Sequence, residues 1–318
     1  MASSSIRQAL GKWSISADVV LAVLVVGVVA LLVVPLPTWL LDLLLASNLA
    51  ASVSILLVSL YVGEALKISA FPTLLLITTL IRLGLNVSST RLILLEGDAG
   101  RVIEAFGQFV VSGNYVVGAV VFVILALIQF IVVAKGSERV AEVGARFTLD
   151  ALPGRQLSID AELRAGSIDA AEAHEQRKLL TRESQFYGAM DGAMKFVKGD
   201  VIASFVIALV NIVAGLAIGV GQRGMDFATA LRRYGLLTIG DGLVSQIPSL
   251  VLATAAGILV TRVASEDGDT ALGEDLSRQL LSEPRALRVS GCFVLGLAVV
   301  PGLPALPFLL IGALLLAS

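Results

Sequence analysis

The chain has 318 residues, of which 57% are hydrophobic and 15% are charged, and its mean hydropathy is +0.91. Soluble domains are about 45–50% apolar and about 25% charged, so this composition indicates an integral membrane protein. The net charge of −2 argues against a nucleic-acid partner. The one cysteine and one histidine cannot form a disulfide or a metal-binding cluster. We therefore expect no metal, no cofactor and no enzymatic activity.

Long uncharged runs predict an all-α, polytopic membrane protein with about eight transmembrane helices, because about 20 apolar residues cross a hydrocarbon core of about 30 Å. The third span is a compromised one, since its apolar run stops at Arg82 and resumes with a polar far end that reaches Arg91. After Arg288 the apolar sequence predicts two short helices in a hairpin. The other predicted spans cover residues 19–35, 43–63, 111–134, 201–220 and 242–261.

This pattern divides the chain into three parts. Residues 1–134 hold a cytoplasmic tail and helices one to four, residues 135–200 form a small cytoplasmic insert, and residues 201–318 hold helices five to eight. The distribution of positive charge places 17 of the 23 Lys and Arg residues on the side of the N-terminus, which predicts that both termini face the cytoplasm. Because the chain ends inside a hydrophobic helix, we expect a further domain beyond it.

The insert opens with charges of alternating sign. Arg139, Glu142, Arg146 and Asp150 are spaced three, four and four residues apart, so on a helix they share one face and neighbours can form ion pairs. A solvated helix explains the same spacing without any function. The Pro-Gly pair at 153 and 154 is expected to end this helix.

Ionisable residues near spans are costly and are functional candidates by default. Asp200 follows Lys195 and Lys198 at the predicted cytoplasmic mouth of the fifth span, where it is either a helix cap or a carboxylate whose proton affinity those lysines tune. Asp241 lies near the predicted outer start of the sixth span. A helical rise of 1.5 Å per residue then separates the two carboxylates by about 30 Å and excludes a dyad within one subunit.

Other residues in the predicted spans indicate how the helices pack. Pro248 is expected to break the hydrogen-bond ladder of the sixth span, which favours a place facing the bundle or an aqueous path. Gly215 and Gly219 form a small-xxx-small surface for close helix contact. Arg82 and Arg91 are candidates for charged functional positions, with interfacial anchoring by their long side chains as the alternative.

The stretch RVAEVGARFTLDALPGRQLSID at 139–160 resembles the signature of the FHIPEP family (flagellar, Hr and invasion protein export pore). Three further stretches resemble the same family: RLGLNVSSTR at 82–91, MDGAMKFVKGD at 190–200 and the run from 239 to 262. Together with the order of the spans, they cover essentially the whole chain. The resemblance favours the virulence branch of the family over the flagellar branch.

The resemblance implies an export-gate component of a type III secretion apparatus in the bacterial inner membrane, which couples the proton-motive force to translocation of unfolded proteins. It implies a ring of nine subunits, contacts with small membrane proteins of the apparatus and with the export ATPase complex, and a missing C-terminal domain that receives chaperones and secreted proteins. It also favours proton coupling at Asp200, with Lys195 and Asp241 as further candidates. The alternatives are a secondary transporter or ion channel for small solutes, for which no convincing internal repeat is found, and a purely structural ring scaffold.

Overall fold

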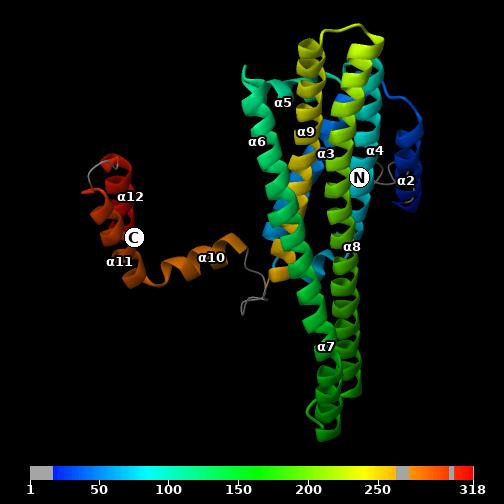
Figure 1. The fold of residues 1–318 in the computed structure, drawn as a ribbon. Coiled ribbons are helices and arrows are strands. Elements are labelled where there is room, and N and C mark those ends of the chain that lie inside the picture. Colours follow the sequence, from blue (N-terminus) through cyan, green and yellow to red (C-terminus); the bar gives the residue numbers. More distant parts are fainter. Residues whose placement is uncertain (1–16, 263–271, 301–303, 318) are drawn as a thin grey trace, which may run out of the picture. The chain divides into compact units, whose positions relative to one another are not determined.

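The computed structural model describes residues 17–262, 272–300 and 304–317 (Figure 1). Within these ranges the chain forms helices and no strand, so the predicted all-α class is confirmed. The chain divides into two compact units. The first lies within residues 1–59 and 68–262, and the second lies within residues 60–67 and 263–318.

The predicted number of eight spans is not confirmed. Among the residues that the structure describes, five helices are long and apolar enough to cross a membrane: Thr38–Tyr61, Phe71–Glu96, Tyr115–Ala165, Ala170–Gln222 and Phe227–Thr261. Shorter apolar helices cover Ala22–Val33 and Ala305–Ala317. An isolated helix of that length falls short of the roughly 30 Å hydrocarbon core.

The first unit begins with helices α2 (Ala17–Val33) and α3 (Thr38–Tyr61). After the 3-10 turn η2 (Ala65–Ile68), helix α4 runs without interruption from Phe71 to Glu96. The polar residues that make this predicted span a compromised one do not interrupt the helix. Helix α4 continues because the polar residues that follow are buried among neighbouring helices, where partners satisfy them, instead of facing lipid.

Helix α5 (Arg101–Val111) is a short amphipathic element whose start is held by α3. Asp42 of α3 accepts hydrogen bonds from the backbone amides of Arg101 and Val102, each at 3.0 Å. Gly100 before it has φ 90°, and a side chain there would collide with that carboxylate. Asp42 thus serves as an N-cap supplied from another helix.

Two long helices form the predicted insert together with the adjoining spans. Helix α6 (Tyr115–Ile128), the π-helical segment η3 (Gln129–Ala134) and α7 (Lys135–Ala165) form one continuous helix. Helix α8 (Ala170–Ala217) continues into a second π-helical segment, η4 (Ile218–Gln222). Each is about 80 Å long at 1.5 Å per residue, so each extends far beyond a bilayer core of about 30 Å.

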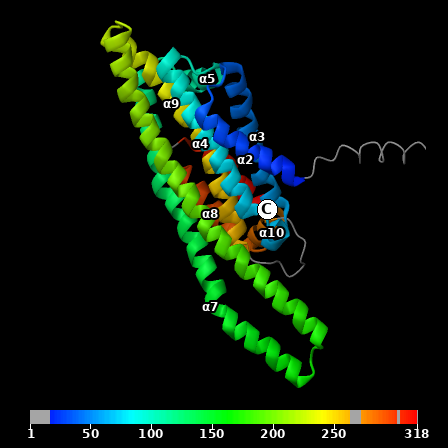
Figure 2. The same cartoon turned by 90° about the vertical axis from the view of Figure 1, so that its right-hand side faces the viewer.

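The Pro-Gly pair does not end the first of these helices. Pro153 lies inside α7, which runs on to Ala165, and Figure 2 shows that α7 bends along its course and pairs with α8 as a hairpin. A proline in a helix interior removes one backbone hydrogen bond and bends the helix. Ion pairs between Arg155 and Glu183 and between Arg177 and Asp160 join the two helices beyond this point.

Helix α9 (Phe227–Thr261) is the most enclosed of the five long apolar helices, with 61% of its most hydrophobic window buried. It packs against α5, α6, α7 and α8.

The second unit contains α10 (Leu272–Leu281), α11 (Pro284–Leu297) and α12 (Ala305–Ala317). Helices α11 and α12 pack as a hairpin in which Gly291 and Gly312 allow close contact. The predicted Pro-rich break partly lies outside the described residues.

Candidate functional site: a buried polar seam

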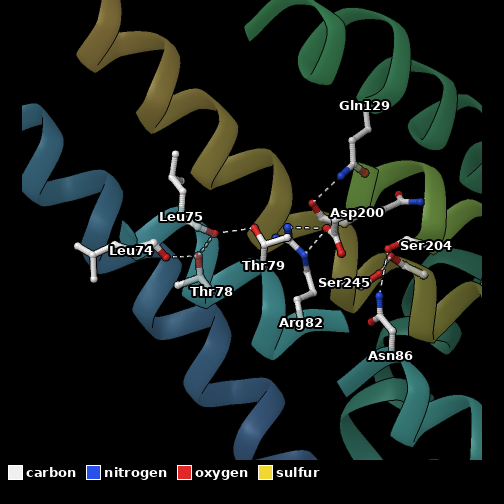
Figure 3. Close-up of polar contacts among 12 residues, drawn as sticks. Leu74, Leu75, Thr78, Thr79, Arg82, Asn86, Gln129, Asp200, Ser204 and Ser245 are labelled. Atoms are coloured by element: carbon white, nitrogen blue, oxygen red, sulfur yellow. Dashed lines mark hydrogen bonds and ion pairs between the residues drawn. The ribbon is translucent and has the colours of Figure 1, made fainter. Parts of the chain in front are cut away.

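Helices α4, α8 and α9 each carry a stripe of buried polar residues, and we call these stripes together the polar seam. Members on α4 and α9 recur mostly every three or four residues, and the two on α8 are eleven residues, about three turns, apart, so the members on each helix share one face. Figure 3 shows the part of the seam around Arg82. Buried polar side chains need hydrogen-bond partners, and the seam provides several of them. Its members are Thr78, Thr79, Arg82, Asn86 and Ser89 on α4, Asp200 and Asn211 on α8, and Asp241, Ser245 and Ser249 on α9.

The centre of the seam is an ion pair between Arg82 and Asp200. Arg82 Nε donates to Asp200 Oδ2 at 2.7 Å, and Nη2 lies 2.5 Å from the same oxygen. Both side chains are 1% exposed. The other oxygen of Asp200, Oδ1, accepts no hydrogen bond from a described residue. The arrangement therefore leaves one buried carboxylate oxygen open beside a compensated charge.

The two lysines that precede Asp200 are not its partners. Lys195 Nζ binds Asp191 at 2.7 Å, and Lys198 Nζ binds Glu138 of α7 at 2.8 Å. The expectation that these lysines tune Asp200 is therefore wrong, because residues two and five positions apart point to different sides of a helix. The cation that faces Asp200 comes from α4, 118 positions away in the sequence.

Two further polar pairs, whose partners could not be identified from the sequence, extend the seam. Asn86 Nδ2 donates to Ser204 Oγ at 3.0 Å, one helical turn beyond the ion pair. Farther along α8, Asn211 Nδ2 lies 3.5 Å from Asp241 Oδ2, and Ser89 interacts with the same carboxylate. The spacing of these polar residues within otherwise apolar helices was the only signal available in the sequence.

The position expected for Asp241 also needs correction. It lies fourteen residues into α9, at the level of Asn211, instead of near the start of the span. Asn211 follows Asp200 by eleven residues, which corresponds to about 16 Å along α8, about half of the expected 30 Å. The two carboxylates still do not share one proton directly.

A family model described as the FHIPEP family matches residues 28–318. The chain belongs to the FHIPEP family.

Curated relatives agree with this membership. The chain is 52% identical to "Low calcium response locus protein D" of Yersinia pestis over 93% of its length and 54% identical to "Hypersensitivity response secretion protein HrcV" of Ralstonia nicotianae over 94%. It is 50% identical to "Flagellar biosynthesis protein FlhA" of Salmonella typhimurium over 96%. The matches cover 42%, 44% and 44% of these relatives, so the chain spans less than half of their length. No solved structure matches the chain.

In this FHIPEP chain, glycines let neighbouring helices approach the seam closely. A Cβ on Gly215 would lie 2.5 Å from the ring of Tyr234 in α9, and a Cβ on Gly219 would lie 2.8 Å from it. Gly240 and Gly242 flank Asp241 in the same way, facing the backbone of α5 and the ring of Phe122. The predicted small-xxx-small surface therefore contacts Tyr234.

The contacts of Pro248 and Arg91 indicate structural roles for both residues. Pro248 is buried inside α9, which continues through it, and Gln129 Nε2 donates to the nearby carbonyl of Gln246 at 3.4 Å. Arg91 is directed at the end of α2, where its guanidinium donates to the carbonyls of Leu32 and Val33. This contact satisfies carbonyls at a helix C-terminus.

The charged ridge of the FHIPEP signature lies on the exposed side of α7. Arg139 binds Glu142 at 2.8 Å, and Arg146 lies 3.6 Å from Asp150. Arg146 and Asp150 are 82% and 71% exposed, and Phe147 between them is 71% exposed. Exposed ion pairs of this kind contribute about 0–1 kcal/mol, so their contribution to folding is small.

Proposed function

We propose that this chain is the membrane part of an export-gate component of a type III protein secretion apparatus, which uses the proton-motive force to drive translocation of unfolded proteins across the bacterial inner membrane. Membership of the FHIPEP family and relatives named as secretion and flagellar biosynthesis proteins support the export role. The observation that carries the proton coupling is the buried Arg82–Asp200 pair. Ionisable residues among membrane helices cost free energy, and they are therefore functional candidates by default.

The pair provides a switch that a single proton can operate. A proton on the open Oδ1 of Asp200 neutralises the charge that compensates Arg82. A buried charge that loses its partner costs about 3–5 kcal/mol. This cost favours a rearrangement in which α4 and α8 repack or water reaches the Arg82 guanidinium. Release of the proton restores the pair, and a cycle of proton uptake and release thereby drives a cycle of helix packing.

The proposed assembly follows the family. The chain is a subunit of a nine-membered ring around a channel of small membrane proteins, with both termini cytoplasmic, and it works with an export ATPase complex. Chaperones and cargo bind a domain beyond this chain, in the part of the relatives that it does not cover. We propose that it belongs to the virulence branch, which the resemblance of its sequence motifs favours.

The role is transport and not catalysis. A secondary transporter for small solutes is the alternative, but transporters of that kind commonly place discontinuous helices at the substrate site. Helix α4 continues through Arg82 and α9 continues through Pro248. These features favour a gate built from continuous helices.

The decisive experiment replaces Asp200 in the bacterial gene. Asp200→Asn imitates a permanently protonated residue, and its amide oxygen still accepts a hydrogen bond from Arg82, so the protein should assemble while secretion is lost. Asp200→Glu keeps the titratable group and should retain partial secretion that a protonophore abolishes. Secretion is measured by the amount of exported protein in the medium, and assembly by the size of the detergent-extracted particle.

Glu175→Gln is the matched control, because Glu175 is an exposed carboxylate on the same helix that pairs with a surface lysine. It should secrete like the wild type. Normal secretion by Asp200→Asn would reduce Asp200 to a packing residue and direct the search for the coupling group to Asp241.

A further inference from the structure

A cavity of about 270 Å³ lies between α6, η3, α8 and α9, beside the polar seam, whose member Ser245 lines it. Its walls are mainly apolar and include Leu127, Phe130 and Phe205. Leu127 and Phe205 are about half exposed on helices that are apolar enough to cross a membrane. The cavity therefore opens toward the hydrocarbon of the bilayer, and no ionisable side chain is among the described residues that line it.

The inner wall of the cavity carries uncharged hydrogen-bonding groups. Gln129, Ser204 and Ser245 line it, and Ser204 is the partner of Asn86 in the seam. Gln129 opens the π-helical segment η3, and such segments are rare insertions that occur often at functional sites. A ligand here would meet apolar walls with a few polar groups, which is the usual character of a small-molecule site.

A cation stands at one end of this cavity. Lys135 follows η3 directly, and its Nζ lies 5.0 Å from the centre of the Phe130 ring, which lines the cavity. Lys135 is exposed, and within the described part of the chain no carboxylate pairs with it. Five residues separate it from Phe130, so it lies about 7.5 Å farther along the helix toward the polar α7.

We propose that this cavity binds an anionic glycerophospholipid. One acyl chain enters past Leu127 and Phe205, and the phosphate group pairs with Lys135. This orientation of the lipid is consistent with a bilayer. The acyl chain points along the apolar helix α6, and the headgroup lies where the polar helix α7 begins. Basic groups beside pockets between membrane helices bind lipid headgroups in this manner. The bound lipid would also contact the segment of α8 that follows Asp200.

The test reconstitutes the purified chain in nanodiscs of phosphatidylcholine with a minor share of phosphatidylglycerol whose acyl chains are brominated. Phe130→Trp is the fluorescent reporter in a background where Trp13 and Trp39 are replaced by Phe. Val132→Trp reports ordinary surrounding lipid, because Val132 lies on the same segment and is 63% exposed. We expect stronger quenching at position 130 than the bulk fraction of brominated lipid predicts, and proportional quenching at position 132.

Two pairs of variants separate the headgroup from the chain. Lys135→Ala should lower the preference for phosphatidylglycerol over phosphatidylcholine about fivefold, the effect of one basic residue at an anionic surface, whereas Lys135→Arg should retain it. Ala126→Phe should fill the cavity and remove the excess quenching, whereas Ala119→Phe, on the exposed side of the same helix, should not.

Proportional quenching at both reporter positions would overturn the site and leave surrounding lipid only. Equal quenching by brominated phosphatidylcholine and phosphatidylglycerol, unchanged in Lys135→Ala, would overturn the assignment of the headgroup. The lysine variants alter an exposed residue and leave the packing intact. This second outcome can therefore be interpreted even if Ala126→Phe fails to fold.

Discussion

At the scale of single residues, a buried guanidinium requires a carboxylate nearby, and the chain meets this need with Asp200. Such pairs rarely stabilise a fold, because desolvating two charges offsets their attraction. Well-packed apolar residues of similar volume often serve stability equally well. On the proposed function, a change of state and not stability accounts for Arg82 and Asp200 in the bundle.

This reasoning predicts opposite results for single and double substitutions. Arg82→Met and Asp200→Leu should each destabilise the protein by about 3–5 kcal/mol, because each leaves one buried charge unpaired. The double variant should return to within about 1 kcal/mol of the wild type or exceed it, yet it should not secrete. Unfolding by SDS in mixed micelles measures the stabilities. Single variants as stable as the wild type would show that water already reaches the pair.

The sequence alone could identify the candidate residues of this site but not their partners. Asp191 and Lys195 are four positions apart, and such a pair can be predicted from helical spacing. Arg82 and Asp200 come from different helices, and only the packing of α4 on α8 brings them together. The same holds for Asn211 and Asp241, whose pairing depends on how far α9 extends before Asp241.

At the scale of elements, contact between α8 and α9 depends on two glycines facing one tyrosine. Tyr234 is completely buried against Gly215 and Gly219. A helix with a small residue at this position can approach its neighbour closely. The position of Asp241, seven residues beyond Tyr234 on the same face of α9, depends on this approach.

Gly215→Ala should destabilise the protein by about 1–3 kcal/mol, because the new methyl group overpacks the contact with Tyr234. Gly192→Ala on the same helix is the control, since no atom lies within 4 Å of its added Cβ. Alanine favours the helix over glycine by up to about 1 kcal/mol, so the control should be neutral or stabilising. The same SDS titration distinguishes the two. An equal response of both variants would mean that α8 and α9 do not approach each other so closely.

The helix boundaries show why local signals were insufficient. A proline followed by glycine usually ends a helix, and in an isolated helix Pro153 would cost about 3 kcal/mol. Helix α7 is not isolated, because beyond the proline its Ile159 packs with Ala173 and Leu180 of α8 in a buried apolar cluster. Pairing along the hairpin outweighs the local preference, and this pairing cannot be deduced from a window of ten residues.

At the scale of the whole molecule, the exposed ridge on α7 is available for contacts with another protein. Arg146→Glu places like charges beside Asp150 and Glu142 on a solvated surface, so stability should change by less than about 0.5 kcal/mol. Secretion should nevertheless fall, and a second substitution, Asp150→Arg, should restore it if the two charges act as a pair.

Lys178→Glu makes the same charge change on the α8 side of the hairpin, where Lys178 pairs with Glu175. It should leave secretion unchanged. Exported protein in the culture medium is again the measurement. Equal loss in both variants would indicate a general effect of charge, and no loss in Arg146→Glu would leave the ridge a solvated helix face.

The uninterrupted course of α8 has a mechanical consequence. Thirty residues separate its start at Ala170 from Asp200, and at 1.5 Å per residue this makes a rigid arm of about 45 Å. If the ion pair acts as the fulcrum, a tilt of about five degrees at Asp200 moves the far tip by about 4 Å. Proton uptake at Asp200 would thus move the far end of the α7–α8 hairpin, through a lever that needs no flexible joint.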